Sequence, residues 1–291
     1  MKIFLPAAAA AALLALGLPS MAAGPAAIAC PAGGVLTRLD APLPRLAARL
    51  AGSEPVRIVA IGSSSTAGAG ATSRETAYPS RLEAALRERF PGRSITVVNR
   101  GINGQDGPEM LARFDTDVAA LQPTLVIWQG GVNALFRDNG LSTAETILRQ
   151  AIARTRTLGA DFLLIDPQYA PRVLADSDTA AMVALQNSVA HAEGVPVFHR
   201  FALMQNWHER AGMAFEAFLA KDNFHMNDWS YDCLARDLAQ SIMASVNAQQ
   251  RTADAQPPAV RAATVAKSAA VTAAPAAPAA APPQVAPPAD L

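Results

Sequence analysis

Five short apolar segments alternate with helical patterns between residues 56 and 198. The segments are Val56–Ile61, Ile95–Asn99, Thr124–Trp128, Asp161–Ile165 and Val195–Phe198. Each is a compact run of the kind found in strands that are covered on both faces. Parallel neighbours need crossover connections, and segments long enough for helices lie between these runs. The sequence therefore predicts an α/β fold, a three-layer α/β/α sandwich around a five-stranded, mostly parallel sheet.

Helix signals separate the predicted strands. Between Tyr78 and Phe90, apolar residues recur at every fourth position, with charges on the opposite side. The sequence Ser142–Glu145 fits a capping box, which predicts a helix that begins there and closes at Gly159. Gly194 is expected to end a further helix in the same way.

Polar, glycine-rich clusters follow three of the predicted strands. They are Gly62–Thr66, Asn99–Gln105 and Gln129–Asn133. In open parallel sheets, ligands bind beyond the carboxyl ends of the strands. The three clusters are therefore expected to meet at one edge of the sheet.

Both ends of the chain differ in composition from its middle. Residues 1–22 begin with Met1-Lys2, continue with an Ala/Leu-rich stretch and have small residues up to Ala22, as in a secretory signal peptide. The apolar stretch is short for a membrane span, which needs about 20 residues. The signal predicts an exported protein, either periplasmic or secreted.

The remaining chain is expected to have three parts. Residues 23–54 form an N-terminal extension, and residues 55–250 form one domain with a well-buried core. Residues 251–291 are rich in Ala and Pro and predict a disordered tail, through which the protein could associate with the cell envelope.

The chain has two cysteines, Cys30 and Cys233. In an oxidising compartment an even number of cysteines favours a disulfide, so an intrachain bond between them is expected. A lipoprotein signal at Ala27–Cys30 is an alternative, although the apolar core of the signal ends about a dozen residues earlier.

Four short motifs occur in order along the predicted domain. They are Gly62-Ser-Ser64-Ser-Thr66, Asn99-Arg-Gly-Ile-Asn-Gly104, Gly131-Val-Asn133 and Asp222-Asn-Phe-His225. In this order, the motifs resemble the four signature blocks of the SGNH (GDSL-type) hydrolase family, and the resemblance covers about residues 55 to 245. It implies a flavodoxin-like SGNH hydrolase fold.

The resemblance implies a role for each of five residues. Ser64 is the expected nucleophile, His225 the general base and Asp222 the group that orients the imidazole. The N–H groups of Ser64 and Gly104 and the side-chain amide of Asn133 are the expected oxyanion hole. The three-residue step from Asp222 to His225 suits this role, because the carboxylate can reach the imidazole within one turn.

Two positions depart from the family pattern. Ser63 precedes the expected nucleophile where the family commonly has aspartate, and Ala134 follows Asn133 where it also commonly has aspartate. Neither position belongs to the triad. The two replacements are expected to change the hydrogen bonds that support the loops carrying Ser64 and Asn133.

Other residues compete for the same roles. Ser63 or Ser65 is an alternative nucleophile, and a serine at this position also suits a helix cap or a turn. Three further histidines are alternative bases, but none has an aspartate three residues before it: His191, His199 and His208. Trp229, close behind His225, is expected to form a wall of the site.

No cofactor, metal ion or nucleic-acid partner is expected. The run Gly68-Ala-Gly70 lacks the third glycine of a dinucleotide fingerprint, and no histidine, cysteine and aspartate cluster has metal-ligand spacing. The net charge is +0 and there is no basic block.

The resemblance and the predicted export together favour a serine esterase that hydrolyses carboxylic esters through an acyl-enzyme at Ser64. The expected substrate is a small ester or an acylated carbohydrate with a short acyl or O-acetyl group. One alternative is an O-acyltransferase acting on envelope polysaccharide, because water and a sugar hydroxyl attack the same intermediate. The other is a non-catalytic envelope-binding module, which has no need for an ordered triad.

Overall fold

The structure is a computed structural model that describes residues 29–31, 33–138 and 140–255. The chain divides into residues 1–30 and a unit from Pro31 onward, which contains all the helices and strands named below. The predicted signal peptide, residues 1–22, lies outside the described residues. The disordered tail was predicted for residues 251–291, but α12 continues to Asp254, so its first residues are helical; the residues from 256 onward lie outside the described part.

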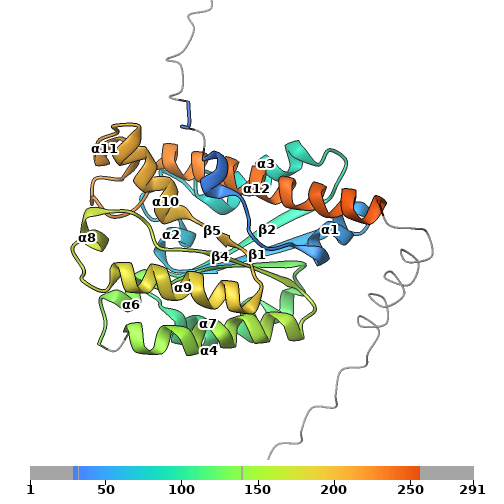
Figure 1. The fold of residues 1–291 in the computed structure, drawn as a ribbon, viewed down its shortest axis with the longest axis horizontal. Coiled ribbons are helices and arrows are strands. Elements are labelled where there is room, and N and C mark those ends of the chain that lie inside the picture. The colour runs from blue at the N-terminus through green and yellow to red at the C-terminus, as the bar shows by residue number, and fades with distance from the viewer. Residues whose placement is uncertain (1–28, 32, 139, 256–291) are drawn as a thin grey trace, which may run out of the picture. The chain divides into compact units, whose positions relative to one another are not determined.

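Five parallel strands form the sheet, in the order β2-β1-β3-β4-β5 (Figure 1). The predicted α/β fold with a five-stranded parallel sheet is therefore confirmed. This strand order is the flavodoxin-like one, in which ligands bind where the chain reverses its direction of winding, between β1 and β3. The strands are β1 (Val56–Gly62), β2 (Ile95–Gly101), β3 (Leu125–Gln129), β4 (Asp161–Ile165) and β5 (Val197–Phe198).

Helices connect successive strands and cover both faces of the sheet. Those before β3 are η1 (Gly34–Thr37), α1 (Pro44–Ala51), α2 (Ser64–Ala67), α3 (Tyr78–Arg89), α4 (Gly107–Ala112), α5 (Phe114–Asp117) and η2 (Ala119–Leu121). Those after β3 are α6 (Val132–Leu135), α7 (Gly140–Thr157), α8 (Pro171–Leu174), α9 (Thr179–Glu193), α10 (Arg200–Gln205), the π-helical turn η3 (Asn206–Arg210), α11 (Phe215–Phe218) and α12 (Asp228–Asp254).

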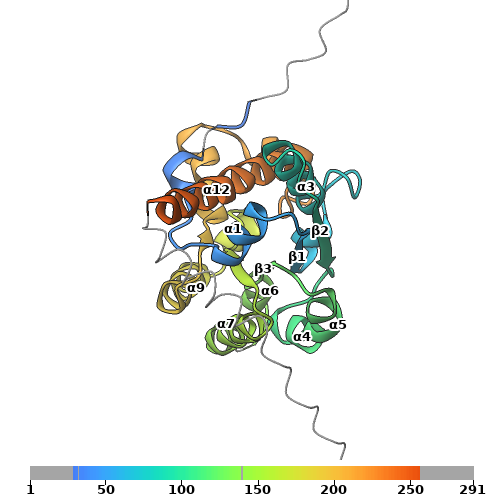
Figure 2. The same ribbon diagram turned by 90° about the vertical axis from the view of Figure 1, so that its right-hand side faces the viewer.

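The sheet is the middle of three layers. Figure 2 shows α3 and α12 on one side of the strands and α4, α5, α7 and α9 on the other. Val59 and Ile61 of β1 pack with Leu148 of α7 and Val189 of α9 in one buried apolar cluster. Removing these side chains from water stabilises the layers by roughly 1.5–3 kcal/mol for each large side chain.

Several element boundaries differ from the sequence predictions, among them the starts of β5 and α7. β5 begins at Val197, two residues later than predicted, because Pro196 has no N–H to donate to a ladder. α7 begins at Gly140, so Ser142 lies inside its first turn and not at its start. The capping box in this region of the fold is instead formed by Asp106 and Glu109 at the start of α4.

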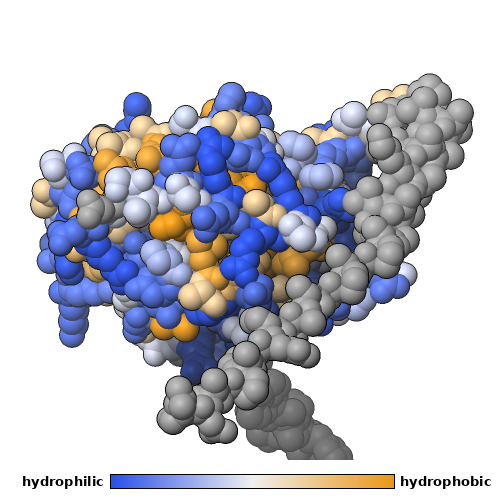
Figure 3. All heavy atoms as spheres, turned by 90° about the horizontal axis from the view of Figure 1, so that it is seen from below, coloured by the Kyte–Doolittle hydropathy of each residue, from blue (hydrophilic) through white to orange (hydrophobic). Residues whose placement is uncertain are grey.

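Charged side chains cover the outer surface of the α7 layer. Arg149 of α7 pairs with Glu145 and Glu193, and Arg156 pairs with Glu193 as well. The face in Figure 3 is accordingly largely hydrophilic, with apolar side chains in separate patches. No helix among the described residues is long and apolar enough to cross a membrane.

Both cysteines are disulfide-bonded. The predicted bond between Cys30 and Cys233 is therefore confirmed.

A buried carboxylate connects β4 to α1. Asp161, the first residue of β4, is only 8% exposed, and its Oδ2 accepts a hydrogen bond from the Leu46 N–H at 2.8 Å. Burial raises the pKa of Asp161 to about 6, against the smaller opposing effect of the N–H groups of Leu46 and Arg45. The ionised carboxylate is thus favoured less in the folded chain than in the unfolded one.

This shift predicts a pH-dependent effect of Asp161→Asn. Because the folded pKa lies above the unfolded one, the stability linked to this group is fully present below about pH 4 and is lost as the pH rises through about 6. Asparagine keeps an acceptor for Leu46 without the charge. The free energy of unfolding of the variant, relative to wild type, should rise by up to about 3 kcal/mol between about pH 4 and 7.5 in urea titrations. A pH-independent difference would contradict the prediction.

Candidate active site

The turn from β1 into α2 places Ser64 at a helix N-terminus. β1 ends at Gly62, and Ser64 is the first residue of α2, so its N–H has no acceptor one turn earlier in the helix. A Cβ on Gly62 would lie 2.1 Å from Thr66 Oγ1, so only glycine fits this close turn. Ser64 is 9% exposed, with its neighbours Ser63 and Ser65 more deeply buried.

His225 is carried by a tight loop between α11 and α12. Leu219 and Met226 form an antiparallel bridge, and the Ala220 N–H donates to the His225 carbonyl at 2.8 Å. Asn223 turns the chain in a left-handed conformation at φ 51°, which asparagine tolerates better than most residues. The loop thereby has a fixed geometry without regular secondary structure.

Asp222 fixes both the loop and the imidazole. Its Oδ1 accepts the N–H groups of Phe224 and His225, each at 3.0 Å, and its Oδ2 lies 2.6 Å from His225 Nδ1. Desolvation of the carboxyl opposes ionisation, but these hydrogen bonds outweigh it and lower the pKa of Asp222. Asp222 is therefore a carboxylate at neutral pH and can only accept the Nδ1 proton.

The histidine connects this carboxylate to Ser64. His225 Nε2 lies 2.8 Å from Ser64 Oγ. Since Nδ1 carries its proton toward Asp222, Nε2 of the neutral ring is an acceptor and the serine hydroxyl donates to it. The structure thus brings Ser64, His225 and Asp222 into one hydrogen-bonded chain. Neither Ser63 nor Ser65 makes this contact.

The two expected oxyanion residues lie on neighbouring loops that contact each other. Gly104, between β2 and α4, has φ +75°, and its N–H donates to no acceptor within the part of the chain that the structure describes. Asn133 of α6 donates from Nδ2 to the Gln105 carbonyl at 2.8 Å. Arg137 donates to the Gly104 carbonyl at 2.8 Å and pairs with Glu109 at 2.7 Å. These bonds fix the loop and leave the Gly104 N–H and one Asn133 amide hydrogen available.

Two supporting residues were missed in the sequence. Asp106 caps α4, is 6% exposed and also accepts the Gly131 N–H. It therefore connects the Gly104 loop to the Asn133 loop. Burial raises the pKa of Asp106, partly offset by its hydrogen bonds with the N–H groups of Gly107 and Gly131. The capping-box pattern Asp106–Glu109 was the available signal for this residue.

Arg113 is the second missed residue. Its guanidinium donates to the Gly62 carbonyl at 3.1 Å and to Gln105 Oε1 at 2.6 Å, and it pairs with Asp117 at 2.6 Å. It thus joins the end of β1 to the Gly104 loop. Nothing in the local sequence identifies such a long-range contact.

The alternative histidines lie in other surroundings. His199 Nδ1 lies 3.5 Å from Asp166 Oδ2, and this interaction raises the pKa of His199. His208 stacks on Phe215, with ring centroids 4.1 Å apart, and its Nδ1 contacts the Met213 carbonyl.

The last rival histidine and the expected site wall are also placed by the structure. His191 is exposed in the last turn of α9. Trp229 packs edge to face on the fully buried Trp207, with centroids 5.2 Å apart. Its role as a wall of the site remains a prediction.

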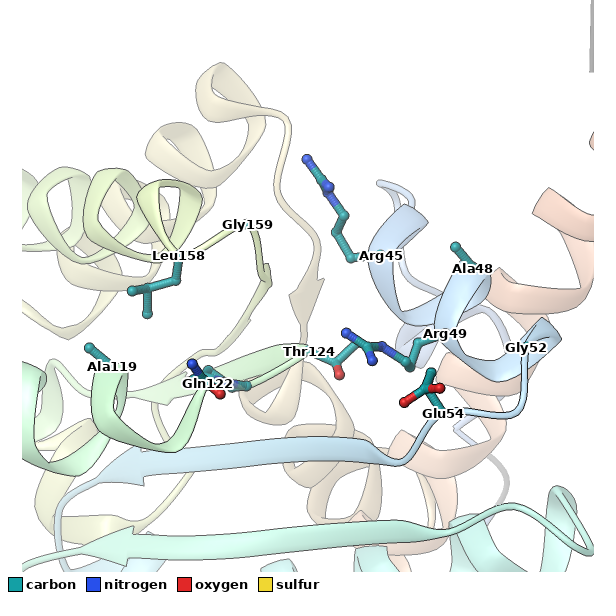
Figure 4. A pocket seen from close by; sticks show the side chains of 11 residues that line it. Arg45, Ala48, Arg49, Gly52, Glu54, Ala119, Gln122, Thr124, Leu158 and Gly159 are labelled. Atoms are coloured by element: carbon teal, nitrogen blue, oxygen red, sulfur yellow. The ribbon is translucent and has the colours of Figure 1, made fainter. Parts of the chain in front are cut away.

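A pocket of about 680 Å³ lies at the opposite edge of the sheet (Figure 4). It adjoins the segments that precede β1 and β3, so it is at the amino ends of the strands. It is lined by Arg45, Ala48, Arg49, Gly52, Glu54, Ala119, Gln122, Pro123, Thr124, Leu158 and Gly159.

Within the described residues, no group of three or more histidine, cysteine, aspartate or glutamate residues could hold a metal ion.

A doubly wound parallel sheet with this serine, histidine and aspartate at its carboxyl edge defines the class of SGNH-like hydrolases, as the motifs predicted. The chain belongs to the non-GDSL lipase-like family, whose model matches residues 29–248. That description accords with Ser63, which replaces the aspartate of a Gly-Asp-Ser-Leu motif.

One known protein is similar in sequence to part of this chain. An acetylxylan esterase of Geobacillus stearothermophilus is 29% identical over 104 residues, which are 32% of this chain and 48% of that protein. The chain thus spans about half the length of this curated relative.

Solved structures share the fold. A two-domain esterase active on acetylated mannans superposes with a TM-score of 0.60 at 18% identity, covering 72% of this chain and 56% of that one. A lipase/acylhydrolase from Enterococcus faecalis gives a TM-score of 0.53 at 22% identity, covering 65% and 96%.

Gly70 lets the segment that follows α2 approach the loop between α11 and α12 closely. We call this loop, which carries His225, the histidine loop. Gly70 has φ +86°, and a Cβ there would lie 2.4 Å from the Met226 carbonyl oxygen and 3.1 Å from His225 Cβ. The same segment is held by Thr72, which donates from its N–H and Oγ1 to Asp228 at 2.8 and 2.5 Å. A side chain at position 70 would therefore displace the histidine loop from Ser64.

Gly70→Ala is expected to separate His225 from Ser64 and slow the reaction of Ser64 with a fluorophosphonate. A misplacement of about 1 Å can cost about 10²-fold in rate, which sets the expected loss. Gly194→Ala is the matched control, because φ is +61° there and nothing lies within 4 Å of the added Cβ. Both variants bear backbone strain, but only Gly70→Ala should lose reactivity. Equal labelling rates in mass spectrometry would contradict this role.

Proposed function

We propose that this protein is an exported serine esterase that hydrolyses short-chain acyl esters of carbohydrates through an acyl-enzyme at Ser64. The observation that carries the proposal is the hydrogen-bonded chain from Asp222 through His225 to Ser64 Oγ, with contacts of 2.6 and 2.8 Å. A hydroxyl, a base and a group that orients the base are the requirements of nucleophilic acyl transfer.

In the proposed reaction, His225 Nε2 takes the Ser64 proton as Oγ attacks the ester carbonyl carbon. The resulting oxyanion accepts hydrogen bonds from the N–H groups of Ser64 and Gly104 and from Asn133 Nδ2. His225 then gives its proton to the departing alcohol, which leaves the acyl group on Ser64. Water, deprotonated by His225, attacks this ester in turn and releases the carboxylic acid and free Ser64.

The carbohydrate substrate is supported by the relatives. One is named an acetylxylan esterase and another is an esterase active on acetylated mannans. The supports for export are the signal-like residues 1–22 and the disulfide between Cys30 and Cys233, a bond typical of oxidising compartments.

The proposal predicts strongly non-additive losses in the triad. Ser64→Ala should lower the rate of 4-nitrophenyl acetate hydrolysis to the residual rate that substrate binding and the oxyanion hole provide without the nucleophile. Adding His225→Ala should cost little more, because the residues act as one unit. Steady-state kinetics of the single and double variants measure this. Independent, multiplicative losses would argue against a triad.

A fluorophosphonate should label Ser64 and neither Ser63 nor Ser65. Only Ser64 Oγ contacts His225 Nε2, so only this hydroxyl has a base within reach. Peptide mapping after labelling identifies the modified serine. A label on either neighbour would reassign the nucleophile.

Asn133→Ala is expected to lower kcat by about 10² to 10³ with little change in KM, because the amide acts on charge that appears only in the transition state. Asn133→Asp keeps the size of the side chain but replaces the amide donor with an acceptor, so it should be at least as impaired. Thermal unfolding of both variants checks that loss of the bond to Gln105 has not disrupted the fold. A change confined to KM would assign Asn133 to substrate positioning.

A further inference from the structure

An arginine covers two aromatic rings beside the triad. Arg172 Cζ lies 4.3 Å from the ring centroid of Phe136 and 5.2 Å from that of Phe224. The two rings are themselves 5.9 Å apart. We call these three residues the Arg172 platform.

Each residue of the Arg172 platform comes from a different segment at the carboxyl edge of the sheet. Phe136 follows α6, which carries Asn133, and Arg172 belongs to α8, which follows β4. Figure 1 shows α6 and α8 at the same end of the sheet. Phe224 belongs to the histidine loop, and its ring centroid lies 4.6 Å from that of His225. These distances place Arg172 Cζ no farther than about 10 Å from the His225 ring.

The positive charge of Arg172 has no anionic partner within the described residues. Its guanidinium makes no ion pair and no hydrogen bond there, and the side chain is exposed. Arg137 differs, since it is engaged by Glu109 and the Gly104 carbonyl. The ring faces hold the Arg172 guanidinium by cation–π contact and leave its N–H donors unused.

An unused guanidinium fork suits a carboxylate, which it can bind through two parallel hydrogen bonds. The position next to His225 suits a group attached near the ester that is cleaved. An acylated polysaccharide provides such a carboxylate where it carries a uronic acid unit.

We propose that the Arg172 platform is a binding subsite for the carboxylate of a uronic acid unit in the acylated polysaccharide. The subsite would make the enzyme prefer acidic over neutral acetylated oligosaccharides. This inference rests on the proposed esterase function, and it adds the class of sugar that the site selects.

The test compares Arg172→Gln with wild type on three substrates: 4-nitrophenyl acetate, a neutral acetylated xylo-oligosaccharide and the same oligosaccharide carrying one glucuronic acid. The variant should lose about tenfold in kcat/KM on the acidic oligosaccharide, through KM, as expected for loss of one charge-assisted contact. The other two substrates should change by less than about twofold. Arg172→Lys should retain part of the preference, because it keeps the charge without the planar fork.

Arg251→Gln is the matched control, because Arg251 is exposed near the far end of α12, some 23 residues, or about 35 Å of helix, from Asp228. It should leave all three rates unchanged. Equal loss by Arg172→Gln on the acidic and neutral oligosaccharides, or no loss on either, would overturn the subsite.

A binding measurement separates failure of the subsite from failure of the esterase function. If wild type hydrolyses none of the three esters, the proposed function fails. Calorimetry of Ser64→Ala protein with non-acetylated oligosaccharides still tests the subsite. Tighter binding of the acidic oligosaccharide, lost on adding Arg172→Gln, supports it, and equal affinity for the acidic and neutral compounds refutes it.

Discussion

The register of three parallel strands determines where the candidate site forms. Gly62, at the end of β1, lies opposite Gly101 of β2 and Gln129 of β3, so the three chains leave the sheet at one level. There is no room for larger side chains here, since a Cβ on Gly101 would lie 2.0 Å from the Ala67 nitrogen. α2 therefore packs directly on the strand ends and delivers Ser64 to the edge that also receives the Gly104 and Asn133 loops.

The histidine loop comes from a segment about 160 residues later and is held there by short-range contacts. Thr72 binds Asp228 at the start of α12, and the Tyr231 hydroxyl donates to the Ala69 carbonyl at 2.7 Å. Both contacts join α12 to the segment that follows Ser64. The geometry between His225 and Ser64 thus depends on how closely this segment approaches the loop, which explains why a glycine is required at position 70.

Local signals were sufficient to predict most of the fold. Asp161–Ile165 coincides with β4, and the other strands differ only at their ends, where pairing with neighbours decides the last residue. The proximity of Ser64 and His225 was expected from the resemblance of the four motifs to the SGNH hydrolase family. Asp106 was missed although its capping box with Glu109 is a local pattern. Its contact with Gly131 and the aromatic platform of Arg172 join segments that are distant in sequence, so neither contact has a local pattern.

The carboxyl groups at the two edges of the sheet have pKa values shifted in opposite directions, so acidification affects the stability linked to each of them differently. Asp161, buried at the amino edge, has a pKa raised to about 6, so acidification neutralises it early and relieves the cost of its burial. Asp222 has a lowered pKa, because N–H donors from its own loop outweigh desolvation, so its contribution to stability persists until the pH falls through that lower value. Mild acid therefore neutralises Asp161, at the contact between β4 and α1, before it neutralises Asp222, which orients His225. The ionisation of Asp222 is thus determined by its own loop and not by the burial that shifts the pKa of Asp161.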